Sequence, residues 1–188
     1  MSPSPDISRA SLYSCLLTRQ TGRAVRLSIE RQLAERSGPV LTVLDFSDVA
    51  IIDFSCADEV VAKLAQDHAG REASRERYFL FVGMDEHHVD PVESSLRRRA
   101  LAVAAELASG ASCLLGDVGA RSREVWKLVC RNGGVRPELV ATELELPSRD
   151  AGGVLRRLYE RRLVLRRDDE YVSLRRALEE ASRPDRQR

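Results

Sequence analysis

The feature that most constrains the fold is a pair of apolar runs rich in β-branched and aromatic residues. Residues 40–46 and 78–82 both have the pattern of strands that lie inside a sheet covered on its two faces. Helical patterns flank these runs, with apolar residues gathered on one side at 25–33 and at 60–65. Strands that alternate with helices predict an α/β fold, in which helices pack on a mainly parallel sheet.

This alternating pattern covers residues 11–118. Gly38-Pro39 ends one helical pattern, and Pro91 lies where the first turn of another helix tolerates a missing N–H. We expect strands at 11–17, 40–46, 78–82 and 112–115, a further apolar stretch at 49–52, helices at 21–37, 57–70 and 90–107, and a disordered tail at 1–10.

The pattern changes in residues 121–181. Helical stretches dominate first, and two short β-type runs follow around a polar turn at 167–170. We expect helices at 124–131, 137–144, 148–162 and 175–181, strands at 163–165 and 171–174, and a charged tail at 182–188. Three helices followed by a hairpin are the layout of a winged helix-turn-helix domain, so the sequence predicts two domains.

The charge of the chain changes near the same boundary. The whole chain has a net charge of +1. Residues 1–120 hold 13 basic and 17 acidic side chains, whereas residues 121–188 hold 17 basic and 12 acidic ones. The second part is therefore the one expected to accept an anionic partner.

Several classes of protein are not expected. No apolar run is long enough to span a membrane, and the first residues do not resemble a secretion signal, so we expect a cytoplasmic protein. Four scattered cysteines predict reduced thiols without a zinc site. The His87-His88 pair is interpreted as part of a solvated polar loop. Without a phosphate loop or a catalytic constellation, we expect no cofactor, no metal and no enzyme.

One candidate site lies in residues 44–59, where a strand and a bend lead into a helix. Ser55 is expected near the start of that helix, where backbone N–H groups and the helix dipole favour an anion such as a phosphate ester. The alternative is that Ser55 only caps the helix.

Residues 44–59 also resemble the STAS domain of anti-sigma-factor antagonists, in which a Val-Leu-Asp-Phe-Ser type of strand leads to an Asp-Ser-Ser-Gly turn. They are still more similar to a family of bacterial STAS-like proteins, and the resemblance covers residues 11–118. It implies a STAS-like α/β domain. In that turn, Phe54 stands in place of the first serine and Cys56 in place of glycine.

The resemblance also implies a partner. In the antagonists, a kinase-like ATPase that is itself the anti-sigma factor phosphorylates the serine that opens the helix, which corresponds to Ser55. Asp53, Asp58 and Glu59 would then form the contact surface around this phosphoacceptor.

Residues 138–164 resemble bacterial regulators of the winged-helix type, including the MarR-like group. The resemblance implies that Ser148, Arg149 and Gly152 lie at the start of a DNA-recognition helix. It implies phosphate contacts for further arginines, namely Arg156, Arg157, Arg161, Arg166 and Arg167. The alternative is that these arginines only solvate the surface and that the domain docks a protein. Asp150 and the acidic turn at 168–170 would repel phosphate.

Together these patterns predict a bacterial signalling protein that couples a STAS-like domain to a DNA-binding winged helix and regulates transcription. The expected partners are double-stranded DNA, a kinase-like ATPase or anti-sigma factor, and a second copy in a homodimer. The alternative function is that of an anti-sigma-factor-antagonist-like protein whose winged helix makes protein contacts only.

Overall fold

A five-stranded sheet organises the protein. The computed structural model describes residues 4–68 and 76–183. The sheet has the order β1–β3–β5–β6–β7, and its strands are parallel except for the antiparallel edge strand β7. These strands are β1 Asp6–Ser11, β3 Val40–Asp45, β5 Arg77–Met84, β6 Ala102–Leu107 and β7 Ser112–Gly116. The protein is therefore of the mixed α/β class with a mostly parallel sheet, as the sequence predicts.

One face of this sheet is covered by helices from the first half of the chain. They are α1 Arg19–Ala34, α2 Phe54–Ala57, the π-helix η1 Asp58–Lys63, α3 Leu64–His68 and α4 Glu86–Arg97. Leu44, Phe79 and Phe81 point from the strands into the core beneath these helices. A short parallel pair, β2 Cys15–Leu16 with β4 Ile51–Ile52, lies beside this layer.

Residues 120–182, called here the C-terminal module, contain a second set of elements. They are α5 Ala120–Asn132, β8 Gly134–Val135, α6 Pro137–Glu143, α7 Ser148–Glu160, β9 Leu165–Arg167, β10 Glu170–Val172 and α8 Leu174–Ser182. The three strands form a small antiparallel sheet in the order β8–β10–β9. The expected order of helices and hairpin is found, and β8 is an additional strand.

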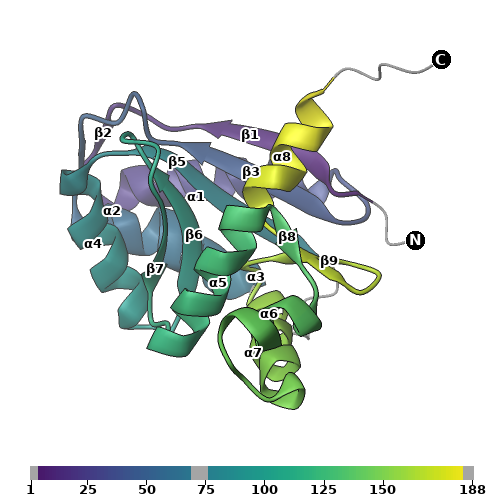
Figure 1. The fold of residues 1–188 in the computed structure, drawn as a ribbon. Coiled ribbons are helices and arrows are strands. Elements are labelled where there is room, and N and C mark those ends of the chain that lie inside the picture. The colour runs from purple at the N-terminus through teal and green to yellow at the C-terminus, as the bar shows by residue number, and fades with distance from the viewer. Residues whose placement is uncertain (1–3, 69–75, 184–188) are drawn as a thin grey trace.

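The C-terminal module packs against the second face of the large sheet (Figure 1). Leu41, Tyr78 and Leu80 of the sheet belong to the same buried cluster as Trp126 and Leu155 of the module. The connection between them is short, and Arg123 of α5 donates hydrogen bonds to carbonyl oxygens at its start, including Gly116 O at 2.9 Å. The two predicted domains thus share the hydrophobic cluster on this face of the sheet, while the cluster on the other face belongs to the first half of the chain.

The helix expected at 90–107 is wrong over its second half. Helix α4 ends at Arg97, and Ala102–Leu107 forms strand β6 between β5 and β7. The alanines in this stretch favour a helix intrinsically, but burial between two strands determines the outcome. Pro91 lies inside α4 because the helix is capped earlier, by Asp85.

The tail expected at 1–10 is also partly wrong. Asp6–Ser11 pairs with β3 as the parallel edge strand β1, with Ser8 and Ala10 buried. The strand expected at 11–17 is consequently divided, and only β2 remains of its second half. Residues 1–3, 69–70 and 184–188 of the expected tails and helix lie outside the described residues.

Within the described residues, no helix is both long enough and apolar enough to cross a membrane.

Candidate functional site

The start of α2 is the first candidate site. The Asp53 carboxylate accepts a hydrogen bond from the Cys56 backbone N–H at 2.7 Å, so Asp53 is the helix cap. Ser55 is the second residue of the helix and is half-buried. The interpretation of Ser55 as the cap is therefore wrong, and its hydroxyl is not engaged in capping. Asp53 and Ser55 do lie at the helix start, as predicted.

The two carboxylates expected to form an exposed contact surface beside Ser55 are buried instead. Asp58 is 7% exposed and Glu59 is 2% exposed. Arg99 donates two hydrogen bonds to Asp58, and Arg19 reaches Glu59 at 3.1 Å. A buried carboxylate needs such cationic partners because desolvation is otherwise too costly. Asp58 and Glu59 therefore anchor η1 to its neighbours.

The electrostatics of this buried cluster keep both carboxylates ionised. Hydrogen bonds from Arg99 lower the pKa of Asp58 below its ordinary value, against the opposing effect of burial. Burial acts to raise the pKa of Glu59, but hydrogen bonds from Lys63 and Arg19 outweigh it and lower that pKa. The sequence contains no signal for these pairings, because Arg99 and Arg19 are about 40 residues away from their partners.

Exposed apolar side chains border the start of α2. Leu17 is 45% exposed and Ile51 is 46% exposed. Leu17 and Ile51 adjoin Asp53, because the Asp53 N–H donates to Leu16 O and β4 ends one residue before Asp53. The surface around Ser55 is thus more apolar and less acidic than the sequence predicts.

Helix α7 forms the second candidate site. One side of it is buried in the module through Ala151, Val154, Leu155 and Leu158. The opposite side presents exposed Arg149 and Arg156, with half-buried Gly152 between them. An added Cβ at Gly152 would meet no atom within 4 Å. Ser148 is the first residue of the helix, is exposed and makes no side-chain capping bond.

The arginines expected to contact phosphates fall into two groups. Arg156, Arg157 and Arg166 are exposed. Arg161 instead donates hydrogen bonds to Ala100 O at 3.3 Å and Asp117 O at 2.7 Å, and Arg167 pairs with Glu180. Arg161 and Arg167 are half-buried, and their guanidinium groups are engaged within the protein: Arg161 ties the module to the sheet and Arg167 ties the hairpin to α8.

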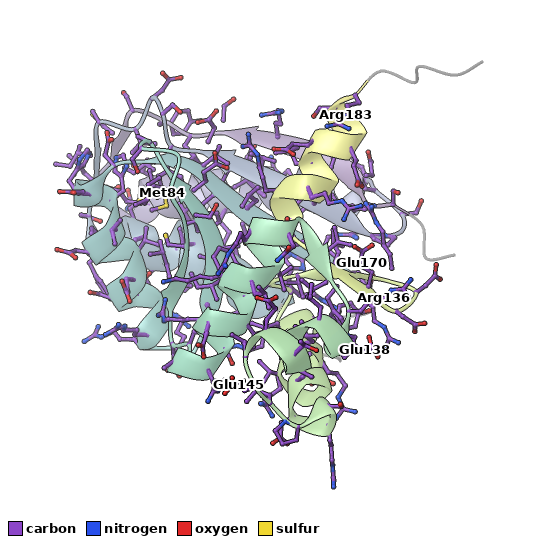
Figure 2. The ribbon with its side chains drawn as sticks, viewed as in Figure 1. Met84, Arg136, Glu138, Glu145, Glu170 and Arg183 are labelled. Atoms are coloured by element: carbon purple, nitrogen blue, oxygen red, sulfur yellow. The ribbon has the colours of Figure 1, made fainter. Side chains whose placement is uncertain are left out.

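Acidic residues lie close to the exposed side of α7. Asp150 is exposed in its first turn. Glu138 and Glu145 lie by α6 (Figure 2), and both are exposed. The positive charge of the second half of the chain is therefore not spread over the whole module. Arg149 and Arg156 are exposed cations on the outer side of α7, and Arg156 also lies 3.4 Å from the Glu160 carboxylate.

The Asp85, His87 and His88 side chains lie close enough to share a metal ion geometrically, with ligand atoms within 4.8 Å of one another. However, His88 is buried, its Nδ1 accepts from the Asp85 N–H, and its Nε2 donates to Val49 O at 2.8 Å. Both ring nitrogens already have partners, which fits a role in capping α4.

Comparison with known proteins adds no assignment to this geometry. No protein-family model matches the chain, and no curated protein matches it significantly.

Proposed function

We propose that this protein is a transcriptional regulator whose C-terminal module is a winged helix-turn-helix that binds double-stranded DNA through α7. The order α5–α6–α7 followed by the β9–β10 hairpin supports this reading of the module. Arg162 adds support, because it stands where winged-helix regulators carry glycine and its φ of 61° lies in the region that favours glycine. The N-terminal half, in this proposal, is a STAS-like regulatory domain.

The observation that carries the proposal is the exposed side of α7. Arg149 and Arg156 are seven residues apart, which is about 10 Å along a helix with a rise of 1.5 Å per residue. The major groove is about 12 Å wide and admits a helix. Gly152, which lies between the two arginines, has no side chain to hold the helix backbone away from DNA.

Because carboxylates lie near α7, the affinity for DNA depends in this proposal on a few arginine–phosphate contacts. Asp150, Glu138 and Glu145 repel phosphate, so Arg149 and Arg156 supply much of the favourable electrostatic energy. Such binding weakens steeply as salt rises, because phosphate contacts release condensed counterions.

The test is a fluorescence-anisotropy titration of a labelled duplex between about 50 and about 200 mM salt. Replacing Arg149 and Arg156 with alanine should weaken binding and reduce the slope of log K against log salt by about 2, near 0.9 for each contact. The matched control replaces Arg31 and Arg97, exposed arginines of the opposite helix layer, and should change neither quantity. The absence of duplex binding at low salt, or an equal effect of both double variants, contradicts the proposal.

The exposed apolar residues around Ser55 favour a second candidate function. Leu17 and Ile51 are 45% and 46% exposed beside the start of α2, which suits a protein partner such as a kinase-like ATPase. In this second function, phosphorylation of Ser55 raises or lowers the affinity for the partner protein. Intact-mass analysis of protein from its native host, with Ser55→Ala as the control, tests for the added phosphate. If Ser55→Asp changes neither partner capture nor DNA affinity, this second function is wrong.

A further inference from the structure

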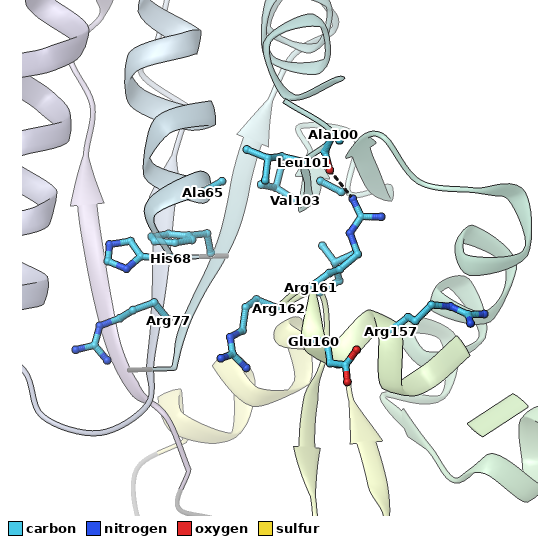
Figure 3. A pocket seen from close by; sticks show the side chains of 13 residues that line it. Ala65, His68, Arg77, Ala100, Leu101, Val103, Arg157, Glu160, Arg161 and Arg162 are labelled. Atoms are coloured by element: carbon cyan, nitrogen blue, oxygen red, sulfur yellow. Dashed lines mark hydrogen bonds between the residues drawn. The ribbon is translucent and has the colours of Figure 1, made fainter. Parts of the chain in front are cut away.

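A pocket of about 610 Å³ lies at the amino-terminal ends of β5 and β6 (Figure 3). Its walls come from both halves of the chain: α3 and the two strands on one side, and residues 157–163 at the end of α7 on the other. Pockets of about 300–1,000 Å³ are the usual size for small-molecule ligands. The volume is thus large enough for a compact organic molecule.

The body of the pocket is apolar. Phe79, Leu101 and Val103 line it from the sheet side, Ala65 from α3, and Leu163 from the C-terminal module. These side chains offer surface for an apolar group but no hydrogen bonds, so they favour a ligand with a hydrocarbon or aromatic body.

Arg161 places a positive charge at the edge of this apolar space. Its guanidinium donates to Ala100 O and Asp117 O through the same nitrogen, Nη2, and Figure 3 shows it beside Ala100. No carboxylate of the described residues lies within 4.0 Å of it. Burial lowers the pKa of Arg161 from its ordinary value, and the charge of Asp117 offsets this only in part, which marks a partly desolvated cation.

The other buried arginine heads at the pocket are directed elsewhere. Arg77 donates to Arg36 O at 2.9 Å and Gly38 O at 2.5 Å, beyond the pocket wall. Arg162 pairs with Glu76 at 3.5 Å. Arg157, which also lines the pocket, is exposed, and the lining carboxylate of Glu160 contacts Arg156 at 3.4 Å. Arg161 is therefore the partly buried side chain best placed to receive an anionic group of a ligand.

His68 supplies a second polar atom. It packs against Phe79, with ring centroids 5.8 Å apart, and its buried Nε2 has no hydrogen-bond partner among the described residues. Burial lowers the pKa of His68, so the ring is neutral near pH 7. A buried, unpaired ring nitrogen is costly unless a ligand or water satisfies it.

We propose that this pocket binds a small organic anion with an apolar body. The apolar body lies against Phe79, Leu101 and Val103, the anionic group pairs with Arg161, and a polar atom of the ligand hydrogen-bonds to His68. This site is separate from the surface of Arg149 and Arg156, because it lies at the end of α7 that packs against the sheet; Arg157 borders it, and Glu160 of its wall pairs with Arg156.

The test uses two fluorescent probes that share their ring systems. The anionic probe is 8-anilinonaphthalene-1-sulfonate, and the neutral probe is N-phenyl-1-naphthylamine, which lacks the sulfonate. Saturable binding of the anionic probe at one site per chain is expected. Arg161→Gln should weaken it about tenfold, the effect of losing one charged hydrogen bond, and should change the neutral probe's affinity by less than about twofold. The matched control, Arg131→Gln, removes an exposed arginine of the same module and should alter neither probe.

A second variant keeps the test decisive if Arg161→Gln does not fold. Ala65→Phe projects a large side chain into the pocket and should abolish binding of both probes while circular dichroism shows a folded protein. Retention of the anionic probe by folded Ala65→Phe overturns the proposal. So does an equal affinity of that probe for the wild type and folded Arg161→Gln, or a parallel loss of both probes in Arg161→Gln.

Discussion

The carboxylate of Asp58 accepts two hydrogen bonds from the guanidinium of Arg99, from Nε at 2.9 Å and from Nη2 at 3.0 Å. The two residues are 41 positions apart in the sequence. The pair ties the π-helix η1 to the turn that follows α4, close to the candidate site at the start of α2. The pair is bidentate and mostly buried, and in this geometry an arginine–carboxylate pair stabilises the folded protein most.

Asp58→Asn is expected to lower the free energy of unfolding by about 2 kcal/mol at pH 7. The substitution leaves the Arg99 cation without its counter-charge. The expected loss is smaller than for a fully buried pair because the Arg99 side chain is 28% exposed. Urea unfolding of the two proteins measures the difference. Asp169→Asn, in the exposed hairpin turn, is the control and should leave the stability unchanged.

The same pair predicts a pH dependence. The pKa of Asp58 is lowered in the folded protein by the hydrogen bonds from Arg99. The pair's contribution to the free energy of unfolding is therefore fully present above the pKa of aspartate in the unfolded chain, about 4. It is lost as the pH falls through the lower pKa that Asp58 has in the folded protein. The stability difference between wild type and Asp58→Asn should shrink between pH 5 and pH 3, each about one unit from that value. A constant difference across this range contradicts the role assigned to the pair.

Two glycines should respond oppositely to the same substitution. A Cβ at Gly22 of α1 would lie 2.9 Å from the Glu59 Cβ and 3.0 Å from Cys56 O. Gly22→Ala should therefore destabilise the protein by about 1–3 kcal/mol, although alanine favours helix. At Gly152, nothing lies within 4 Å, so Gly152→Ala should stabilise it by about 0.5–1 kcal/mol. Thermal unfolding separates the two outcomes, and a stabilising Gly22→Ala would show that α1 and η1 are not in close contact.

The sequence predicts the parts of the fold in which local pattern and burial agree. Strands β3 and β5 and helices α1, α5 and α7 were all expected near their observed positions, because each has a consistent apolar period over its length. Strand β6 was not, since its alanines favour a helix locally and only the neighbouring strands make it extended.

For the candidate sites, too, the sequence predicts what depends on local pattern and misses what depends on contacts between distant residues. Asp53 and Ser55 could be placed at a helix start from a local motif. The burial of Asp58 and Glu59 depends on Arg99 and Arg19, which no local pattern links to them. The pocket at Arg161 could not be predicted either, because its walls come from α3, β5, β6 and α7.

The cysteines should differ strongly in reactivity. Cys15 is exposed, whereas Cys56 is 0% exposed and burial raises its pKa to about 11. Because the thiolate is the reactive form, iodoacetamide should modify Cys15 rapidly near pH 8 and Cys56 only after unfolding. Peptide mass analysis over time measures both rates, with Cys15→Ser as the control. Rapid labelling of Cys56 in folded protein would contradict the tight packing between α1 and α2.

The shared core predicts that the two halves of the chain unfold together. Trp126 is the only tryptophan, lies in the C-terminal module, is 4% exposed and donates a hydrogen bond to Leu163 O. Its fluorescence therefore reports on that module, whereas far-UV circular dichroism reports on the whole chain. In urea, the two signals should give one midpoint, as expected for a single cooperative unit.

Two buried leucines of β3 allow a direct test of whether the two halves unfold together. Leu41 faces the C-terminal module, Leu44 faces the opposite helix layer, and both are 0% exposed. Replacing either with alanine should lower the free energy of unfolding by about 3 kcal/mol. If the halves unfold as one unit, Leu44→Ala shifts the Trp126 transition as far as the circular dichroism transition, although Leu44 lies across the sheet from the module. A Trp126 midpoint that stays at the wild-type value in Leu44→Ala, while Leu41→Ala moves it, would show that the halves unfold independently.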